Sequence, residues 1–295
     1  MMRNNNLYGT GVALVTPFDK SGKIDFAALE QHLNRIIDGG INYLTLLGTT
    51  GEPPTMTKEE KSEILKFVKE KTAGRVPIVL GIGGNNTSAV VEEILNTDLS
   101  GIDSILSICP YYTKPSQRGI YAHFEAVAKA SPLPVILYNV PGRTSKNIDP
   151  DTVIKLANDF KNIVAIKEAS GNMNQIMSIL AKKPKDFCVI SGDDSLAVPM
   201  ISLGCVGVIS VAANVVPVQF SKMIKSALEG DFAAAREIHF SLLELMNALF
   251  EDGSPSGAKA ALNILGIMEE NLRLPLVPVS PSVREKIKTL LSKLS

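Results

Sequence analysis

The chain has 295 residues, of which 45% are hydrophobic and 20% charged, and its 30 Lys and Arg balance its 30 Asp and Glu. This composition is typical of a globular protein with one large core, and the length fits a single α/β barrel. The zero net charge argues against nucleic acid or a membrane surface as a partner, and no apolar run is long enough to span a bilayer.

The three cysteines indicate a reducing compartment. Cys109, Cys188 and Cys205 are odd in number, far apart and set in apolar stretches, so we expect buried reduced thiols. Because none has CxxC spacing or a histidine nearby, no metal site is expected. Residues 1–7 lack the apolar core of a signal peptide, which together with the thiols predicts a cytoplasmic location.

Short apolar runs alternate with amphipathic helical patterns over the first three quarters of the chain. Near-continuous apolarity is typical of parallel strands that are covered on both faces. Eight runs fit this description, and we expect strands at residues 12–15, 43–47, 78–82, 104–108, 135–138, 163–166, 187–190 and 207–211. Eight strands alternating with helices predict a (β/α)8 TIM barrel over residues 1–228, in preference to an open doubly wound sheet.

After Leu228 the pattern contains helices only. Residues 232–250, 257–265 and 283–294 each carry a helical apolar pattern. We therefore expect a C-terminal helical extension over residues 229–295, packed against the barrel or against a partner subunit.

Lys167 ends the sixth predicted strand, and in such a barrel the strand ends form the active face. Alternation along a strand puts Lys167 on the same face as Ala165 and opposite to Ile166. If the bulkier residue faces the helices, Lys167 points into the barrel mouth, where loss of water disfavours its charged form and favours an amine that attacks carbonyl groups. The alternative is a lysine that pairs with Glu168 or reaches solvent.

Tyr138 ends the fifth predicted strand, and Arg143 follows it. Tyr138 shares its face with Ile136 and would also enter the mouth, where a phenol can carry a proton between an imine carbon and an oxygen. Arg143 lies just beyond the strand, where its guanidinium can bind a carboxylate at two points. A core aromatic residue and a surface loop charge are the respective alternatives.

The second predicted strand ends in Gly-Thr-Thr-Gly-Glu at residues 48–52. Small hydroxyl residues between glycines let backbone N–H groups approach a carboxylate, although a turn that needs glycine has the same pattern. Asp193 and Asp194, after the seventh strand, are better explained as the start of a helix than as cation ligands. A lysine, a tyrosine, hydroxyls and an arginine together indicate imine chemistry on a carbonyl compound that carries a carboxylate.

Several motifs resemble those of the pyruvate-dependent class I aldolase (N-acetylneuraminate lyase) superfamily. Residues 48–52, 138–144 and 166–169 carry its signatures, and residues 110–116 and 191–194 are similar to the dihydrodipicolinate synthase family within it. The similarity extends over nearly the whole chain. It implies a lyase that condenses pyruvate with L-aspartate-4-semialdehyde, in the diaminopimelate route to L-lysine.

The resemblance also implies a role for each site residue. Lys167 would form the Schiff base, and Tyr138 would carry protons through Thr49 to Tyr112 of a neighbouring subunit. Thr50 and nearby backbone N–H groups would bind the pyruvate carboxylate, and Arg143 would bind the carboxylate of the semialdehyde. Ile209 would line the pocket. The family needs no metal or dissociable cofactor and forms homo-oligomers, usually tetramers built from dimers.

At the family's feedback site this sequence departs from members that lysine inhibits. Those members carry a Ser-Ala pair, a histidine and a glutamate where this chain has Pro53, Pro54, Lys61 and Ala89, while Asn85 and Tyr111 match. The carboxylate that would pair with an amine is absent and a positive charge is added. We therefore expect weak inhibition by lysine or none.

Two other functions compete with this interpretation. A sister aldolase, such as N-acetylneuraminate lyase or a 2-keto-3-deoxy sugar acid aldolase, would use the same Lys167 and Tyr138, but a polyol chain favours neutral hydrogen bonders over Arg143. A binding barrel without activity would be expected to lack Lys167 or Tyr138, and this chain has both.

Overall fold

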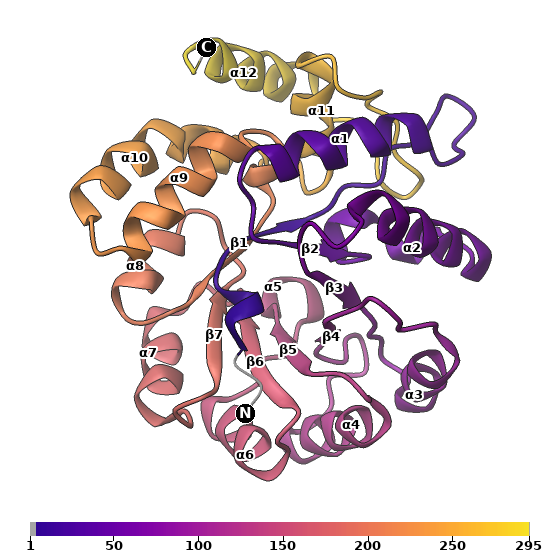
Figure 1. Ribbon diagram of the computed structural model, residues 1–295, viewed down its shortest axis with the longest axis vertical. Coiled ribbons are helices and arrows are strands. Elements are labelled where there is room, and N and C mark those ends of the chain that lie inside the picture. The colour runs from indigo at the N-terminus through magenta and orange to yellow at the C-terminus, as the bar shows by residue number, and fades with distance from the viewer. Residues whose placement is uncertain (1–3, 295) are drawn as a thin grey trace.

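A closed barrel of eight parallel strands forms the centre of the molecule (Figure 1). The structure is a computed structural model that describes residues 4–294. Residues 1–3, which belong to the segment predicted not to be a signal peptide, lie outside the described residues. The strands pair in chain order and β8 returns to β1, which confirms the TIM barrel and excludes the open sheet. They are β1 (Gly9–Ala13), β2 (Tyr43–Leu46), β3 (Ile78–Gly81), β4 (Ser104–Ile108), β5 (Val135–Asn139), β6 (Ile163–Glu168), β7 (Cys188–Ser191) and β8 (Gly207–Ser210).

Helices connect the strands and surround the barrel (Figure 1). They are α1 (Phe26–Asp38), α2 (Lys58–Thr72), α3 (Thr87–Asn96), α4 (Gln117–Ala130), α5 (Pro141–Thr144), α6 (Pro150–Asp159), α7 (Met173–Lys182), α8 (Ala197–Ser202) and α9 (Pro217–Leu228), with 3-10 turns η1 (Asn4–Leu7), η2 (Thr49–Gly51), η3 (Pro53–Thr55) and η4 (Ala212–Asn214). Local side-chain bonds define the starts of several helices. At α2, for example, Thr57 and Glu60 form a capping box, as their spacing predicts.

Strand β1 begins three residues earlier than the apolar pattern predicts. Its first residues are small, and a Cβ at Gly11 would lie 2.2 Å from the ring of Tyr43. Because that ring fills the barrel interior beside Gly11, the missing side chain is required by packing. A search for apolar runs does not detect such a residue.

Two apolar clusters lie on either side of the strands. The inner one fills the barrel and includes Ala13, Tyr43, Ile136, Ala165 and Ile209. The outer one joins the other strand faces to the helices and continues into the C-terminal helices. Alternate strand residues therefore reach the barrel interior, which is the arrangement on which the predicted site depends.

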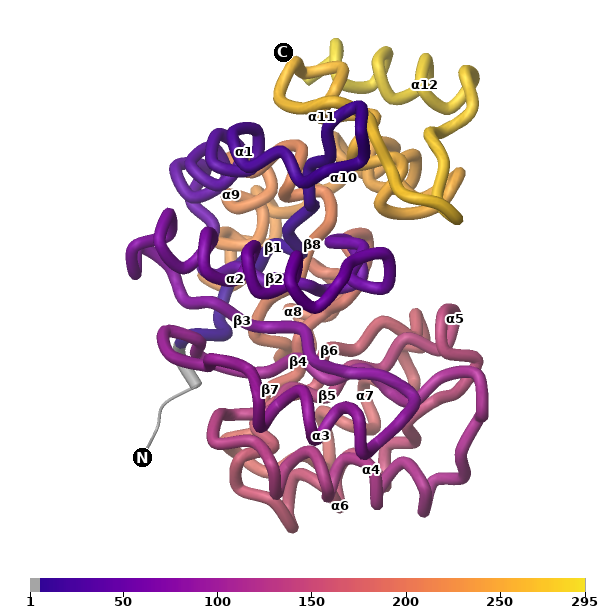
Figure 2. The backbone as a smooth tube through the Cα atoms, turned by 90° about the vertical axis from the view of Figure 1, so that its right-hand side faces the viewer, coloured from indigo at the N-terminus to yellow at the C-terminus, as the bar shows by residue number. Residues whose placement is uncertain are grey.

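The C-terminal extension consists of α10 (Phe232–Ala248), α11 (Ser256–Ile264) and α12 (Pro281–Ser292). Helix α10 packs against α8 and α9, and α11 packs against α12 and η4. Figure 2 shows α11 and α12 on the same side of the barrel as α5, which follows β5. Helices α11 and α12 therefore lie at the barrel end where the strands finish. The division of the extension from the barrel at residue 228 stays a prediction, although α9 ends there.

Among residues 4–294, no helix is both long enough and apolar enough to cross a membrane.

Candidate active site

Lys167 and Tyr138 lie side by side at the ends of β6 and β5. The two residues are paired in the strand register, and Lys167 Nζ is 4.3 Å from the centre of the Tyr138 ring. Lys167 is only 6% exposed, and Tyr138 belongs to the inner cluster. Both side chains therefore point into the barrel, as the alternation predicted, and Lys167 has no salt bridge to Glu168.

Gly192, at the end of β7, provides the space that the lysine side chain occupies. A Cβ at this position would lie 3.1 Å from Lys167 Cε and 2.6 Å from Ala169 Cβ. Its backbone N–H donates to the Glu168 carbonyl at 2.8 Å, so the glycine is held against β6. A larger residue there would displace the end of the lysine side chain.

A buried polar network on the outer face of the same strands fixes the two residues from behind. Glu168 and Asn139 each follow a site residue, and Asn139 Nδ2 donates to the Glu168 carboxylate at 3.1 Å. Gln175 Nε2 and the Ser170 N–H donate to the same carboxylate at 3.0 and 2.8 Å. Asn139 Oδ1 accepts from the N–H of Ile148, which ties in the loop after α5. The network is buried and bonded, so it restricts the strand ends.

Residues 48–52, which we call the β2 loop, form a tight turn at the end of β2. Thr49 begins the 3-10 turn η2, so the first N–H groups of the turn have no partner inside it. Thr50 is buried, and Thr49 lines the cleft described below. The Thr16 hydroxyl donates to the Gly51 carbonyl at 2.9 Å and holds the loop to the segment after β1.

A cleft of about 440 Å³ opens above these residues. Thr49, Tyr138 and Arg143 line it, and the Arg143 guanidinium donates to the Ser254 carbonyl at 3.4 Å. Lys167, Thr50 and Ile209 are buried and are not among the residues that line the cleft. Ile209 packs in the inner cluster with Tyr138. The C-terminal extension completes the wall with four residues that sequence reasoning missed, Ser254, Pro255, Pro275 and Leu276.

The two tyrosines after β4 differ in placement. Tyr111 lines the cleft of its own chain, whereas Tyr112 is 85% exposed and adopts a positive φ of 70°. Tyr112 is therefore directed away from this cleft and is available to a neighbouring molecule.

Asp193 and Asp194 make hydrogen bonds within the fold. Asp193 Oδ1 accepts from the N–H of Ser195 at 2.9 Å, in a turn that precedes α8. Asp194 Oδ2 accepts from the N–H groups of Val211 and Ala212 after β8, and burial raises its pKa to about 6. Within residues 4–294, no group of three His, Cys, Asp or Glu residues is arranged to hold a metal ion.

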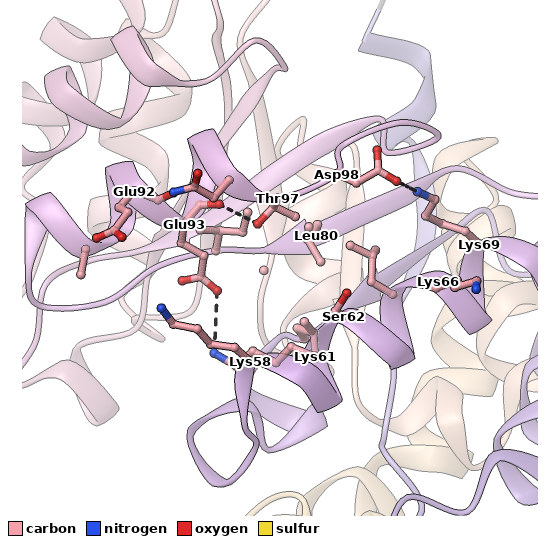
Figure 3. Close-up of a pocket in the computed structure, with 16 residues that line it drawn as sticks. Lys58, Lys61, Ser62, Lys66, Lys69, Leu80, Glu92, Glu93, Thr97 and Asp98 are labelled. Carbon is pink, nitrogen blue, oxygen red and sulfur yellow. Dashed lines mark hydrogen bonds and ion pairs between the residues drawn. The ribbon is translucent and has the colours of Figure 1, made fainter.

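A second cleft of about 480 Å³ lies between α2 and α3 (Figure 3). Lys61 and Glu93 form an ion pair at 3.7 Å and line both clefts, so they stand between them. The family's feedback positions Pro53, Pro54 and Lys61 contribute to the first cleft, and Ala89 to the second. The Lys61 amine therefore lies beside the Glu93 carboxylate.

Comparison with known proteins gives consistent results. The model of the dihydrodipicolinate synthetase family matches residues 6–294. Proteins named 4-hydroxy-tetrahydrodipicolinate synthase from Phocaeicola vulgatus and Parabacteroides distasonis are each 50% identical, with coverage of 99% and 100% of this chain and 99% of either relative. The crystal structure of dihydrodipicolinate synthase from Aquifex aeolicus matches with a TM-score of 0.94 at 43% identity, covering 97% of this chain and 98% of that one.

Proposed function

Because the chain belongs to the dihydrodipicolinate synthetase family, as its motifs predicted, we propose that Lys167 and its neighbours carry out the reaction of a 4-hydroxy-tetrahydrodipicolinate synthase. The enzyme is a lyase of the class I aldolase type that acts in lysine biosynthesis. One observation supports the site assignment above all others, namely the buried Lys167 amine 4.3 Å from the ring of Tyr138, which lines a cleft together with Arg143.

In the first half of the reaction, Lys167 Nζ attacks the keto carbon of pyruvate. Water leaves, and the resulting protonated imine withdraws electrons from the methyl group, which loses a proton to form an enamine. Thr50 and nearby backbone N–H groups hold the pyruvate carboxylate. Tyr138 carries protons between the imine and Thr49, and its position beside Lys167 supports this role.

In the second half, the enamine carbon attacks the aldehyde of L-aspartate-4-semialdehyde. Arg143 binds the carboxylate of this substrate, and Ile209 packs in the inner wall behind the site. The amino group of the condensed substrate then attacks the imine carbon and displaces Lys167 Nζ. Ring closure yields 4-hydroxy-2,3,4,5-tetrahydrodipicolinate and regenerates the amine. Every step uses groups of the protein chain and the two substrates, so the proposal includes no metal or dissociable cofactor.

The proton relay ends at Tyr112 contributed by a second copy of the chain. Its exposed position outside its own cleft supports this arrangement. Activity would then require at least a dimer, and a tetramer built from two dimers is the proposed assembly. We place the enzyme in the cytoplasm, where its buried thiols would stay reduced.

Lysine is expected to inhibit weakly or not at all. A lysine ligand needs a carboxylate for its side-chain amine, and in this chain Lys61 already pairs with Glu93 while Ala89 offers no acid. Activity measured with and without millimolar lysine checks this expectation, with Lys61→Ala as a comparison. Strong inhibition of the wild type would contradict it.

Borohydride trapping tests the proposed chemistry directly. Protein incubated with pyruvate and then reduced should gain the mass of one reduced pyruvate adduct on Lys167. Lys167→Ala should gain none, whereas Lys161→Ala, an exposed lysine at the other end of β6, should react like the wild type. A wild type without an adduct would refute the imine mechanism. A panel of aldehydes supplied with pyruvate then separates the proposed partner from the polyols of the sister aldolases.

A further inference from the structure

A buried ion pair joins the β2 loop to the C-terminal extension. Glu52, the last residue of the loop, and Lys259, on α11, are both fully buried, with Lys259 Nζ 2.5 Å from Glu52 Oε1. We propose that this pair is a positioning device for catalysis, in which the extension holds the β2 loop in the conformation that binds the pyruvate carboxylate. The inference rests on the proposed function, because it assigns that loop to pyruvate.

Several contacts fix the position of the Lys259 Nζ atom. Its Nζ donates to the Asn271 carbonyl at 2.9 Å and lies 4.2 Å from the centre of the Phe18 ring. Asn271 Nδ2 donates to the Phe18 carbonyl, so the ring and the carbonyl are themselves tied together. The lysine thus contacts a carboxylate, a carbonyl and an aromatic face contributed by three separate segments.

Glu52 is placed to transmit this constraint to the loop. It adopts a left-handed backbone with φ of 59°, between the turns η2 and η3. Its N–H donates to the Thr49 carbonyl at 3.2 Å, and its carbonyl accepts from Thr55. Its second carboxylate oxygen accepts from the Arg273 N–H at 3.3 Å. A displacement of the side chain would therefore move the η2 turn that contains Thr49 and Thr50.

The same part of the extension also reaches the opposite side of the cleft. Ser254, shortly before α11, accepts a hydrogen bond from Arg143. A single segment therefore contacts both groups to which the proposal assigns substrate carboxylates, the β2 loop through Lys259 and Arg143 through Ser254. This arrangement links the spacing of the two carboxylate sites to the docking of α11.

Stability alone is a weak reason for such a pair. Removing two charges from water costs about as much as their attraction returns, and neutral residues of the same shape are often equally stable. Burial lowers the pKa of Lys259 to about 8 although the attraction of Glu52 opposes this, which indicates a large desolvation cost. The position of the pair behind the substrate loop gives it a function that a neutral pair would lack.

The double variant Glu52→Gln/Lys259→Met tests the inference, because it removes both charges and keeps the volumes. We expect an unchanged melting temperature, a rise on the order of tenfold in the pyruvate concentration that half-saturates borohydride trapping, and a smaller change in the KM for the semialdehyde. The matched control is Glu251→Gln/Lys286→Met, an ion pair within the extension and away from the loop, which should saturate as the wild type does.

A second variant decides the question if the double variant does not fold. Glu52→Asp keeps the charge but shortens the side chain, and it should raise the same half-saturating concentration at an unchanged melting temperature. Wild-type saturation in whichever of these variants folds would overturn the inference. Failure of the wild type itself to form the adduct would instead refute the proposed function, so the two failures are distinguishable.

Discussion

Two buried lysines at the same end of the barrel have different neighbours. Lys167 Nζ lies 4.3 Å from the Tyr138 ring centre and Lys259 Nζ lies 4.2 Å from the Phe18 ring centre, so both rest on an aromatic face. Lys259 also contacts the Glu52 carboxylate and the Asn271 carbonyl. Among residues 4–294, Lys167 has no such carboxylate in an ion pair.

Under the proposed function, the comparison sets a lysine with a structural role beside a lysine that acts as the nucleophile. An aromatic face alone compensates little of the cost of burying an ammonium group, whereas a carboxylate at contact distance compensates much of it. Burial lowers the pKa of Lys259 to about 8, and the Glu52 carboxylate opposes this loss of charge. Lys167 has no ion pair among residues 4–294, and under the proposed function it reacts with the carbonyl of a substrate that brings its own carboxylate.

Lys167→Met should have the largest effect on activity of the substitutions considered. Under the proposed function, loss of Lys167 should lower kcat on the order of 10³-fold or more, because its Nζ is the amine that lies over the Tyr138 ring. The free energy of unfolding should stay equal or rise, since the side chain has no ion pair to lose. Steady-state kinetics and urea unfolding measure the two effects, and a large loss of stability would contradict the assignment.

Lys259→Met should have the opposite effect. It leaves the Glu52 carboxylate buried without its cation, so we expect a destabilisation of about 3–5 kcal/mol. The double variant Glu52→Gln/Lys259→Met should recover most of this loss. Urea unfolding of the single and double variants checks the prediction, and equal destabilisation of the two would show that volume, not charge, governs the site.

Gly192→Ala tests how closely the neighbouring residues fit around Lys167, because it moves the lysine side chain without removing it. The added methyl group would lie 2.6 Å from Ala169 Cβ and 3.1 Å from Lys167 Cε, so these neighbours must shift at a cost of about 1–3 kcal/mol. The rate of borohydride trapping should fall, on the order of tenfold. Gly84→Ala, where the nearest atom is 3.4 Å away, is the matched control. Equal rates in both variants would contradict a close fit around Lys167.

Asp194 is a buried acid that accepts hydrogen bonds from the N–H groups of Val211 and Ala212. Burial raises its pKa to about 6, from 3.8, so between these pH values the folded state holds the proton and the unfolded state does not. Stability from this group is therefore present at low pH and lost as the pH rises through about 6. From pH 5 to 7, wild-type unfolding free energy should fall by about 1 kcal/mol relative to Asp194→Asn. Parallel pH profiles would contradict this.

Much of the fold was predictable because strand and helix patterns differ in period. The eight strands and the three helices of the extension lie within a few residues of the expected positions. The main error, at the start of β1, arose at Gly9 and Gly11, where a side chain would collide with Asn42 and Tyr43 respectively. A residue that is required because it has no side chain leaves no trace in an apolar pattern.

The site was predictable only in part. Alternation along β5 and β6 predicted that Tyr138 and Lys167 point inward, since this depends on neighbours in sequence. The pairing of Glu52 with Lys259, by contrast, depends on how α11 docks onto the barrel, and a single sequence contains no signal for that. For the same reason the contribution of Ser254 and Pro275 to the cleft wall could not be foreseen.

The left-handed residues at this end of the barrel bear on how the enzyme can be altered. Leu47, Glu52, Tyr112, Lys114 and Ser145 all have positive φ and follow β2, β4 or β5. Glycine would relax each of them but would also add backbone freedom. Consensus or library approaches that select for thermal robustness would favour such replacements. These five positions should therefore be left unchanged when the protein is engineered for thermal stability. Glycine there would raise stability but would loosen the loops at the end of the barrel where substrates are proposed to bind.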